Sequence, residues 1–384
     1  MKKSSSYFFV LLCLLFIECK QKHIDKEVDI PVKLHPVDPG IAEKVYASKI
    51  FDSIVYIPLE TTAQAIVGEI TKVEIIDSLI YCLDRQTHAI WCFNQKGKYV
   101  NHIHKRGQGP GEYVSIFDFT VDRLNNLIAI LDRNTKKILW YTLSGKFVKS
   151  TKLEVSPSNF GLLNDNKILA YTRGVDIFMK GNDGTLGYNY FIIDSTGKTD
   201  AYFPYNDVTD NLVGNKIMEV NDNKVLATYA ANDIIYEFDM DGNLTLKHVI
   251  DFGKYRIPLE KTKDEKYTRE LFSNPQYAQR ASVYYSDNYF LVTYSFEGRV
   301  RFWLCNNKND KNIVGSFLEN DIDFISLADP TPLTVRDNKI YYLKDAYFIL
   351  KQKHDGKPAY LNIPTLSSLK EDDNAVLMIG YLKF

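Results

Sequence analysis

Short apolar stretches alternate with polar turns along most of the chain, a pattern typical of antiparallel β-strands joined one after another. Between residues 79 and 103, apolar stretches at 79–83, 90–93 and 99–103 are separated by a polar turn and by Gly97-Lys98. Glycine in such a turn supplies the positive φ that a tight hairpin requires. The pattern therefore predicts three consecutive strands here.

The same stretch recurs 48 residues later. Residues 127–148 match residues 79–100 without a gap, and 10 of the 22 positions are identical. The identical pairs are Leu79/Leu127, Ile80/Ile128, Leu83/Leu131, Asp84/Asp132, Arg85/Arg133, Thr87/Thr135, Ile90/Ile138, Gly97/Gly145, Lys98/Lys146 and Val100/Val148. Weaker copies of the opening strand lie at 166–171, 223–228, 288–293 and 338–343. A unit of roughly 40–60 residues with about four strands, repeated in this way, predicts the blades of a β-propeller.

The two ends of this repeat region predict how the ring closes. Ile50–Leu59 reads as a strand before the first opening, and Val376–Phe384 reads as a strand after the last. Because blades bury their faces only by stacking in a ring, we expect these two strands to meet in one blade. The charged segment Lys261–Phe272 lacks Pro and Gly and predicts a short amphipathic helix inserted between two blades. The predicted fold is an all-β, six-bladed propeller of four-stranded antiparallel blades over residues 46–384.

The first residues read as a targeting segment. Lys2 and Lys3 precede the apolar run Tyr7–Ile17, which is too short to span a bilayer as a helix. Cys19 follows, as in a bacterial lipoprotein signal, although Glu18 stands where such signals carry a small residue. We expect a signal peptide over 1–18, lipidation at Cys19 and a polar tether over 19–45. The alternatives are ordinary secretion with cleavage nearby, or an uncleaved N-terminal anchor.

Composition narrows the function classes. Lys and Arg number 47 against 48 Asp and Glu, so the net charge of −1 gives no electrostatic case for nucleic acid or an anionic membrane surface. Beyond the signal region three cysteines remain, Cys82, Cys92 and Cys305, and we expect buried free thiols rather than a disulfide framework.

One linker carries a family resemblance. Residues Lys105–Tyr113 read Arg-Gly-x-Gly-Pro-Gly-Glu-Tyr after the first lysine, and an inner strand at 117–122 and the repeat at 126–148 follow. This order resembles the NHL repeat of six-bladed propellers, and more closely the six-bladed β-propeller lipoproteins of Bacteroidota. The opening at 51–62 is also similar to that family. The resemblance implies an exported propeller whose molecular role is mostly unassigned.

The conspicuous residues of the repeat favour scaffold over chemistry. The glycine-rich linker is not followed by a helix, so it lacks the N-terminal dipole that a phosphate loop uses. Its polar residues Arg106, Glu112 and Tyr113 are the candidate binding residues, and Arg106 and Glu112 either pair with each other or reach a face. Asp84 and Asp132 recur at the same place in the repeat, which favours a structural role in the following turn.

No catalytic residue is identified from the sequence. His102 and His104 alternate on one strand and could share a metal, but no third ligand has a recognisable spacing. The carboxylates Asp321, Asp323, Asp372 and Asp373 include no pair fixed at glycosidase separation. No cofactor is identified, and a divalent ion in the central funnel belongs only to the alternative function below.

We expect a non-catalytic ligand- or protein-binding module at the cell envelope, in the outer membrane or periplasm. Its expected partners are a glycan, a peptide or an envelope protein, and its membrane contact is the lipid anchor alone. The alternative is a hydrolase or lyase with a funnel site, metal-dependent in one version, that acts on a glycan or lactone. A third hypothesis is a purely structural partner in an envelope complex. We expect the site where repeats diverge, in the insertions of the third to fifth blades, including Lys261–Phe272.

Overall fold

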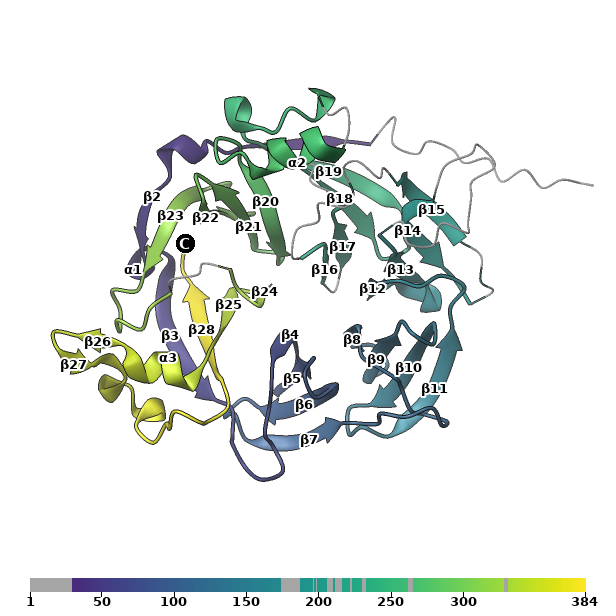
Figure 1. The fold of residues 1–384 in the computed structure, drawn as a ribbon, viewed down its shortest axis with the longest axis horizontal. Helices are drawn as coiled ribbons and strands as arrows, with labels where there is room; N and C mark the ends of the chain where they lie inside the picture. The colour runs from purple at the N-terminus through teal and green to yellow at the C-terminus, as the bar shows by residue number, and fades with distance from the viewer. Residues whose placement is uncertain are drawn as a thin grey trace, which may run out of the picture.

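Six β-sheets stand around one axis as the blades of a propeller (Figure 1). The structure is a computed structural model that describes residues 30–173, 187–195, 197, 199–205, 210, 216–221, 223–229, 233–261, 265–327 and 331–384. Each blade is built on four antiparallel strands, and two blades carry a fifth strand. The prediction of a six-bladed, all-β propeller is therefore confirmed.

The blades are numbered here in chain order of their innermost strands. Blade 1 holds β4 (Ile70–Ile76), β5 (Leu79–Asp84), β6 (Ala89–Asn94) and β7 (Tyr99–Ile103). Blade 2 holds β8 (Asp118–Asp122), β9 (Leu127–Asp132), β10 (Lys137–Thr142) and β11 (Phe147–Lys152). Blade 3 holds β12 (Asn159–Leu162), β13 (Ile168–Tyr171), β14 (Tyr188–Ile193) and β15 (Thr199–Pro204).

Blades 4 to 6 complete the ring. Blade 4 holds β16 (Met218–Val220), β17 (Lys224–Ala227), β18 (Ile234–Asp239) and β19 (Leu244–Asp251). Blade 5 holds β20 (Gln279–Tyr285), β21 (Tyr289–Phe296), β22 (Arg299–Asn306) and β23 (Asn312–Glu319). Blade 6 holds β24 (Thr334–Arg336), β25 (Lys339–Lys344), β28 (Val376–Leu382) and β3 (Phe51–Pro58).

The strands read as runs of apolar residues because both faces of each blade pack against neighbouring blades. In β9, five of the six residues are buried, and in β6 likewise five of six. The predicted strands at 79–83, 90–93 and 99–103 are β5, β6 and β7. A strand that shows both faces to a neighbour gains hydrophobic burial from every residue, which explains the weak alternation.

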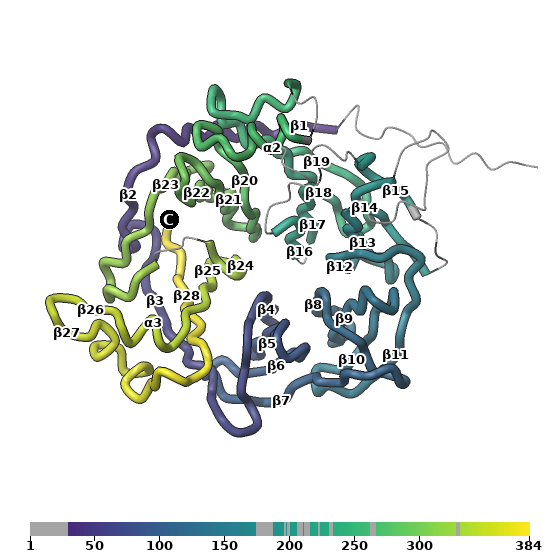
Figure 2. The backbone as a smooth tube through the Cα atoms, in the orientation of Figure 1, coloured from purple at the N-terminus to yellow at the C-terminus, as the bar shows by residue number. Residues whose placement is uncertain are grey.

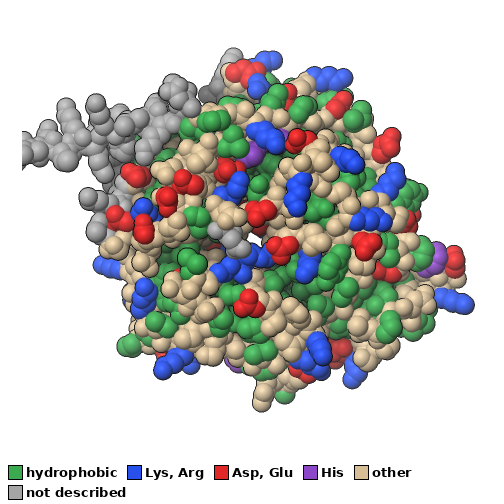
Figure 3. Space-filling model, turned by 180° about the vertical axis from the view of Figure 1, so that it is seen from behind, with side chains coloured by type: hydrophobic (Ala, Val, Ile, Leu, Met, Phe, Trp, Pro, Cys, Tyr) green, Lys and Arg blue, Asp and Glu red, His purple; other side chains and the backbone are tan. Residues whose placement is uncertain are grey.

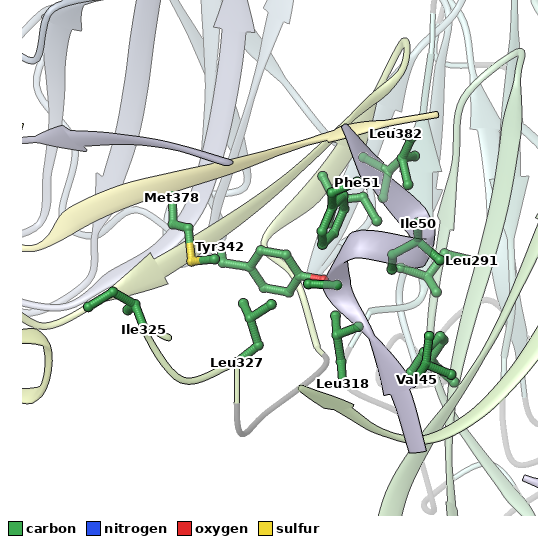
Figure 4. Close-up of a cluster of buried hydrophobic side chains, with 14 of the residues drawn as sticks. Val45, Ile50, Phe51, Leu291, Leu318, Ile325, Leu327, Tyr342, Met378 and Leu382 are labelled. Atoms are coloured by element: carbon green, nitrogen blue, oxygen red, sulfur yellow. The ribbon is translucent and has the colours of Figure 1, made fainter. Parts of the chain in front are cut away.

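The ends of the chain close the ring, as predicted. β3 pairs antiparallel with β28 in blade 6, with Tyr56 opposite Met378. Side chains from β3, β25 and β28 pack together with residues of blade 5, and Phe51 lies beside Leu382 and Ile50 (Figure 4). Two segments more than 300 residues apart in the sequence therefore share one hydrophobic core.

An N-terminal segment runs outside the ring before it enters blade 6 (Figure 2). Its strand β1 (Val32–Pro36) pairs parallel with β19 of blade 4, and β2 (Glu43–Tyr46) pairs parallel with β23 of blade 5. Residues 32–45 fall in the stretch expected to be a tether, and here they add strands to two sheets. The expected signal at 1–18 and Cys19 lie outside the described residues.

Helices are short and peripheral. α1 (Ala47–Ile50) leads into β3, and α2 (Glu265–Ser273) lies at the rim near β20 and β19 (Figure 1). α2 matches the predicted helix, shifted toward its C-terminal end. An insertion of residues 345–375 in blade 6, with α3 (Ala346–Lys351) and the hairpin β26 (Lys353–His354) and β27 (Lys357–Pro358), was not indicated by the sequence. Within the described ranges, no helix is long and apolar enough to cross a membrane.

Candidate functional site

A polar pocket lies on the propeller axis. The innermost strands β4, β8, β12, β16, β20 and β24 all contribute to its lining, and its volume is about 270 Å³. Acidic and basic side chains both border the hollow at the centre of the face drawn in Figure 3. The pocket is therefore charged with both signs, rather than apolar.

One wall of the pocket is a row of ion pairs on blades 1 and 2. Lys72 and Glu74 are two residues apart on β4, so their side chains leave the same face of the strand. The Lys72 Nζ lies 2.9 Å from Asp118 Oδ1 and 3.7 Å from Glu74 Oε1. Asp118 also accepts hydrogen bonds from the Phe160 N–H at 3.2 Å and the Asn159 Nδ2 at 3.3 Å. A carboxylate at the start of β8 thus ties blades 1, 2 and 3 together at the axis.

A second ionic group stands on blades 4 and 5. Lys216, just before β16, forms an ion pair with the buried Glu219 on that strand. The Lys216 Nζ also donates to the carbonyl of Leu333 at 3.3 Å and lies 4.4 Å from the centre of the Tyr284 ring. Lys216 thus bridges blades 4, 5 and 6 in the way that Asp118 bridges blades 1 to 3.

Electrostatics link the two groups across the pocket. Burial alone would lower the pKa of Lys72, but Asp118 and Glu74 outweigh it and raise that pKa. Burial raises the pKa of Glu219, Lys216 lowers it, and the charge of Glu74 raises it further. Each of these buried or half-buried charges therefore depends on its neighbours, and removal of one partner would leave another charge uncompensated.

Two hydrogen-bonding atoms of the lining have no protein partner. Ser282 is completely buried on β20, and its Oγ is unpaired among the described residues. The Nδ2 of Asn221 is likewise buried and unpaired, while its Oδ1 accepts from the N–H groups of Asn223 and Lys224. Because buried polar atoms are normally paired, these two are exceptions in the lining, with hydrogen-bonding capacity left open.

The axial pocket shares lining residues with two lateral pockets. Arg336 and Asp337 also line a pocket of about 540 Å³ between blades 6 and 1. Glu74 and Asn221 also line a pocket of about 590 Å³ across blades 2, 3 and 4. The three pockets are therefore adjacent and share parts of their walls.

The candidate residues of the glycine-rich linker lie elsewhere. Glu112 folds back so that its Oε2 accepts from the Gly109 N–H at 2.8 Å, and a Cβ on Gly107 would collide with that carboxylate. Tyr113 is completely buried, and its hydroxyl donates to His88 or Ile103 carbonyl oxygens, at 2.8 and 3.1 Å. Arg106 is exposed beside them, and the lining of the axial pocket includes none of Arg106, Glu112 and Tyr113.

The repeated aspartates are turn scaffolds, as predicted. Asp84 is fully buried and accepts hydrogen bonds from the N–H of Gly68 at 2.7 Å, the hydroxyl of Thr87 at 2.6 Å and the indole of Trp91 at 3.2 Å. Burial alone would raise the pKa of Asp84, but these hydrogen bonds outweigh it and lower that pKa. Asp132 accepts from the Val114 N–H at 2.8 Å and from the turn that follows it.

The histidines and cysteines singled out in the sequence do not form a metal site among the described residues. Within the described ranges, no three His, Cys, Asp or Glu side chains are placed to hold a metal ion. The Nδ1 of His102 forms a hydrogen bond of 2.7 Å with the Tyr99 hydroxyl, and its ring lies against Trp91. His104 is exposed. Cys82, Cys92 and Cys305 are free and buried, as predicted.

The remaining candidate carboxylates hold the framework. Asp321 accepts from the N–H and hydroxyl of Ser48, which fixes α1, and Asp323 accepts from the Tyr56 hydroxyl at 2.8 Å. Asp373 accepts from the Lys370 N–H. The helix α2 lies at the rim, and the longest part of the blade 3 insertion, 174–186, is outside the described residues.

Sequence reasoning did not single out the residues of the axial pocket. A signal exists in hindsight, since Lys72 and Glu74 interrupt an otherwise β-branched strand at a spacing of two. Lys216 and Glu219 carry no comparable pattern. Their proximity to blade 1 follows only from the closed ring.

These features define a six-bladed propeller with a charged axial pocket. The chain belongs to the family described as a domain of unknown function, DUF4934, whose model matches residues 34–381. A solved structure from Bacteroides fragilis, described as a presumed exported protein, is similar with a TM-score of 0.72 and 19% identity, covering 92% of this chain and all of that one. A member of the DUF4221 family from Bacteroides vulgatus has a TM-score of 0.53 at 11% identity, covering 87% and 97%. No curated protein matches.

Proposed function

We propose that this protein is an exported, lipid-anchored propeller that binds a neutral glycan, without catalysis, in the axial pocket. The observation that carries the proposal is which polar side chains of the pocket lining already have a partner and which do not. The lysines and carboxylates of both walls are held in ion pairs, whereas the buried donors of Ser282 and Asn221 have no partner among the described residues. Hydrogen-bonding capacity is thus open beside these two ionic groups, whose own charges are already paired.

The open groups suit sugar hydroxyls. A hydroxyl both donates and accepts, so it can satisfy a serine oxygen and an amide nitrogen without disturbing an ion pair. A strongly charged ligand would instead compete with Lys72–Asp118 or Lys216–Glu219 and leave one partner buried and unpaired. The two lateral pockets that share lining residues with the axial pocket support an elongated ligand, of which one unit occupies the axis.

Export and anchoring rest on the N-terminal sequence. A basic pair, an apolar run of eleven residues and Cys19 form the order of a lipoprotein signal, and the similar Bacteroides fragilis protein is described as a presumed exported protein. Expression of Cys19→Ser should move the protein from the membrane fraction to the soluble fraction and abolish labelling by a radioactive fatty acid. Retention of the label would contradict lipidation at Cys19.

Ser282→Ala tests the binding site. This change removes a buried oxygen with no partner, so the folded state should be as stable as the wild type or slightly more so. Affinity for a bound oligosaccharide should nevertheless fall by about tenfold, the effect of one lost hydrogen bond. The measurements are thermal unfolding and calorimetric titration against a panel of neutral oligosaccharides and peptides.

Thr293→Val is the matched control. Thr293 is fully buried on the neighbouring strand β21, its hydroxyl is also unpaired among the described residues, and it does not line the axial pocket. It should leave affinity unchanged. Binding of peptides but not oligosaccharides would overturn the ligand class, and a panel with no ligand at all would overturn the binding function.

A further inference from the structure

The N-terminal strand β1 is held on blade 4 by its parallel pairing with β19 and by one buried side chain. Among its five residues only His35 is buried, at 6% exposure, while the other four are exposed. The imidazole enters a slot between blades 4 and 5. It stacks on His248 of β19 with ring centres 5.3 Å apart, and it meets Phe290 and Trp303 of blade 5 edge-on at 5.5 and 5.0 Å.

The slot contains a defined chain of hydrogen bonds. His35 Nε2 lies 3.0 Å from His248 Nδ1, and His248 Nε2 lies 3.2 Å from Glu237 Oε2. Because the carboxylate can only accept, His248 Nε2 carries a proton and its Nδ1 accepts from His35 when both rings are neutral. Lys224 holds Glu237 in place from the other side, at 2.9 Å.

This chain of hydrogen bonds can accommodate one extra proton but not two. A proton on His248 turns its Nδ1 into a donor, and His35 can respond by changing tautomer so that its Nε2 accepts. A second proton, on His35, would set two N–H groups and two positive charges against each other at 3.0 Å. The other charged groups that face His35 are Lys33 of its own strand and Asp310 from the turn before β23.

We propose that the His35–His248 contact is an acid-sensitive latch that holds β1 on blade 4 and releases it when the pH falls. This regulatory device is independent of the proposed glycan site. The released segment ends at Pro36, since Val37 is buried, Arg301 donates to the Pro39 carbonyl and Gly40 lies against the Tyr255 hydroxyl. Release uncovers the backbone of β19 from Lys247 to Asp251, an open strand edge that a second extended segment can pair with.

The direction of the pH effect follows from burial. Desolvation, then the nearby His248 and Lys33, lower the pKa of His35 from 6.5 to about 4, and Asp310 opposes them only in part. The free strand therefore takes up a proton below about pH 6.5, whereas the docked strand remains neutral until about pH 4. Docking is at full strength above pH 6.5 and weakens progressively as the pH falls between these values, by up to about 300-fold in the docking equilibrium.

Hydrogen exchange on the full chain tests the latch. Backbone amides of residues 32–35 and their partners on β19 should lose protection by tenfold or more between pH 7 and pH 4.5, after correction for the intrinsic rate. Amides of β28, at the ring closure, should keep theirs. Unchanged protection of β1 down to pH 4.5 would overturn the proposal.

A non-titrating side chain separates the latch from general acid unfolding. His35→Phe should fill the aromatic slot and keep β1 protected at both pH values, while the exposed His104→Gln should behave as the wild type. If His35→Phe folds poorly, His35→Met offers a flexible apolar replacement for the same measurement. Acid-dependent loss of protection in the non-titrating variant equal to that of the wild type would also overturn the proposal.

Discussion

Blades 1 and 2 carry copies of one sequence repeat in different surroundings. Their 22-residue repeats match at ten positions, and each repeat supplies three strands to its own four-stranded sheet. Blade 2 packs against blade 1, but blade 1 packs against blade 6, where the two ends of the chain meet. A residue at a given repeat position can therefore contribute differently to stability in the two blades. In blade 2 its neighbour is blade 1, and in blade 1 its neighbour is the blade that closes the ring.

Removal of the closing strand should have the largest effect. Deletion of residues 376–384 takes away β28, leaving β3 and β25 without their shared partner and opening the core of Figure 4. We expect an insoluble or broadly unfolding protein in thermal melts followed by circular dichroism. Lys383→Ala, which alters one exposed side chain, is the control. A cooperative melt of the truncated chain at the wild-type temperature would contradict closure through blade 6.

The second largest effect should be a difference in stability between substitutions of the two turn glycines. Gly97 and Gly145 are equivalent and both have positive φ, at 76° and 83°. A Cβ on Gly97 would collide with the backbone carbonyl of Pro58 on β3, whereas one on Gly145 would meet Ile103 Cγ1 at 3.3 Å. We expect Gly97→Ala to cost at least about 3 kcal/mol and Gly145→Ala about 1–2 kcal/mol, the left-handed penalty alone. Denaturant unfolding of both variants measures the difference, and equal costs would contradict it.

Substitution of the repeated aspartates should also cost more stability in blade 1 than in blade 2, by a smaller margin than for the glycines. Asp84 accepts from the Trp91 indole, but the equivalent of Trp91 in blade 2 is Leu139, so Asp132 has no such donor. We expect Asp84→Asn to cost about 2–3 kcal/mol and Asp132→Asn about 1–2 kcal/mol at pH 7. The stabilisation from ionised Asp84 is present above pH 3.8 and is lost as the pH falls through its lowered pKa, so Asp84→Asn should also flatten the acid limb of the stability curve.

The smallest difference concerns two exposed lysines. Lys98 Nζ lies 2.8 Å from Glu60, just after the closing strand β3, whereas the equivalent Lys146 forms no ion pair with the described residues. Because the pair is largely exposed, Lys98→Ala should cost about 0.5 kcal/mol at low salt and less at high salt, with Lys146→Ala near zero. Chemical denaturation at two salt concentrations checks both, and a salt-independent loss in Lys98→Ala would contradict an ionic origin.

Much less of the candidate site than of the fold could be predicted from the sequence. The repeat pointed to Asp84 and the glycine linker, and repetition correctly marked Asp84 as scaffold. Lys72, Asp118, Lys216 and Glu219 occur once each, on strands whose neighbours at the axis come from other blades. No periodicity along the chain reports an electrostatic interaction between residues nearly 150 positions apart.

The sequence by itself determined the strands, the blade repeat, the number of blades and the pairing of the two chain ends, because hydrophobic burial and turn chemistry act over a few residues and repeat with the blade. Only the tertiary structure decided which charges meet on the axis, which donors lack a partner, and that β1 and β2 join blades 4 and 5 from outside. These depend on distances set by closure of the whole ring, so each follows from all six blades together and from no single segment.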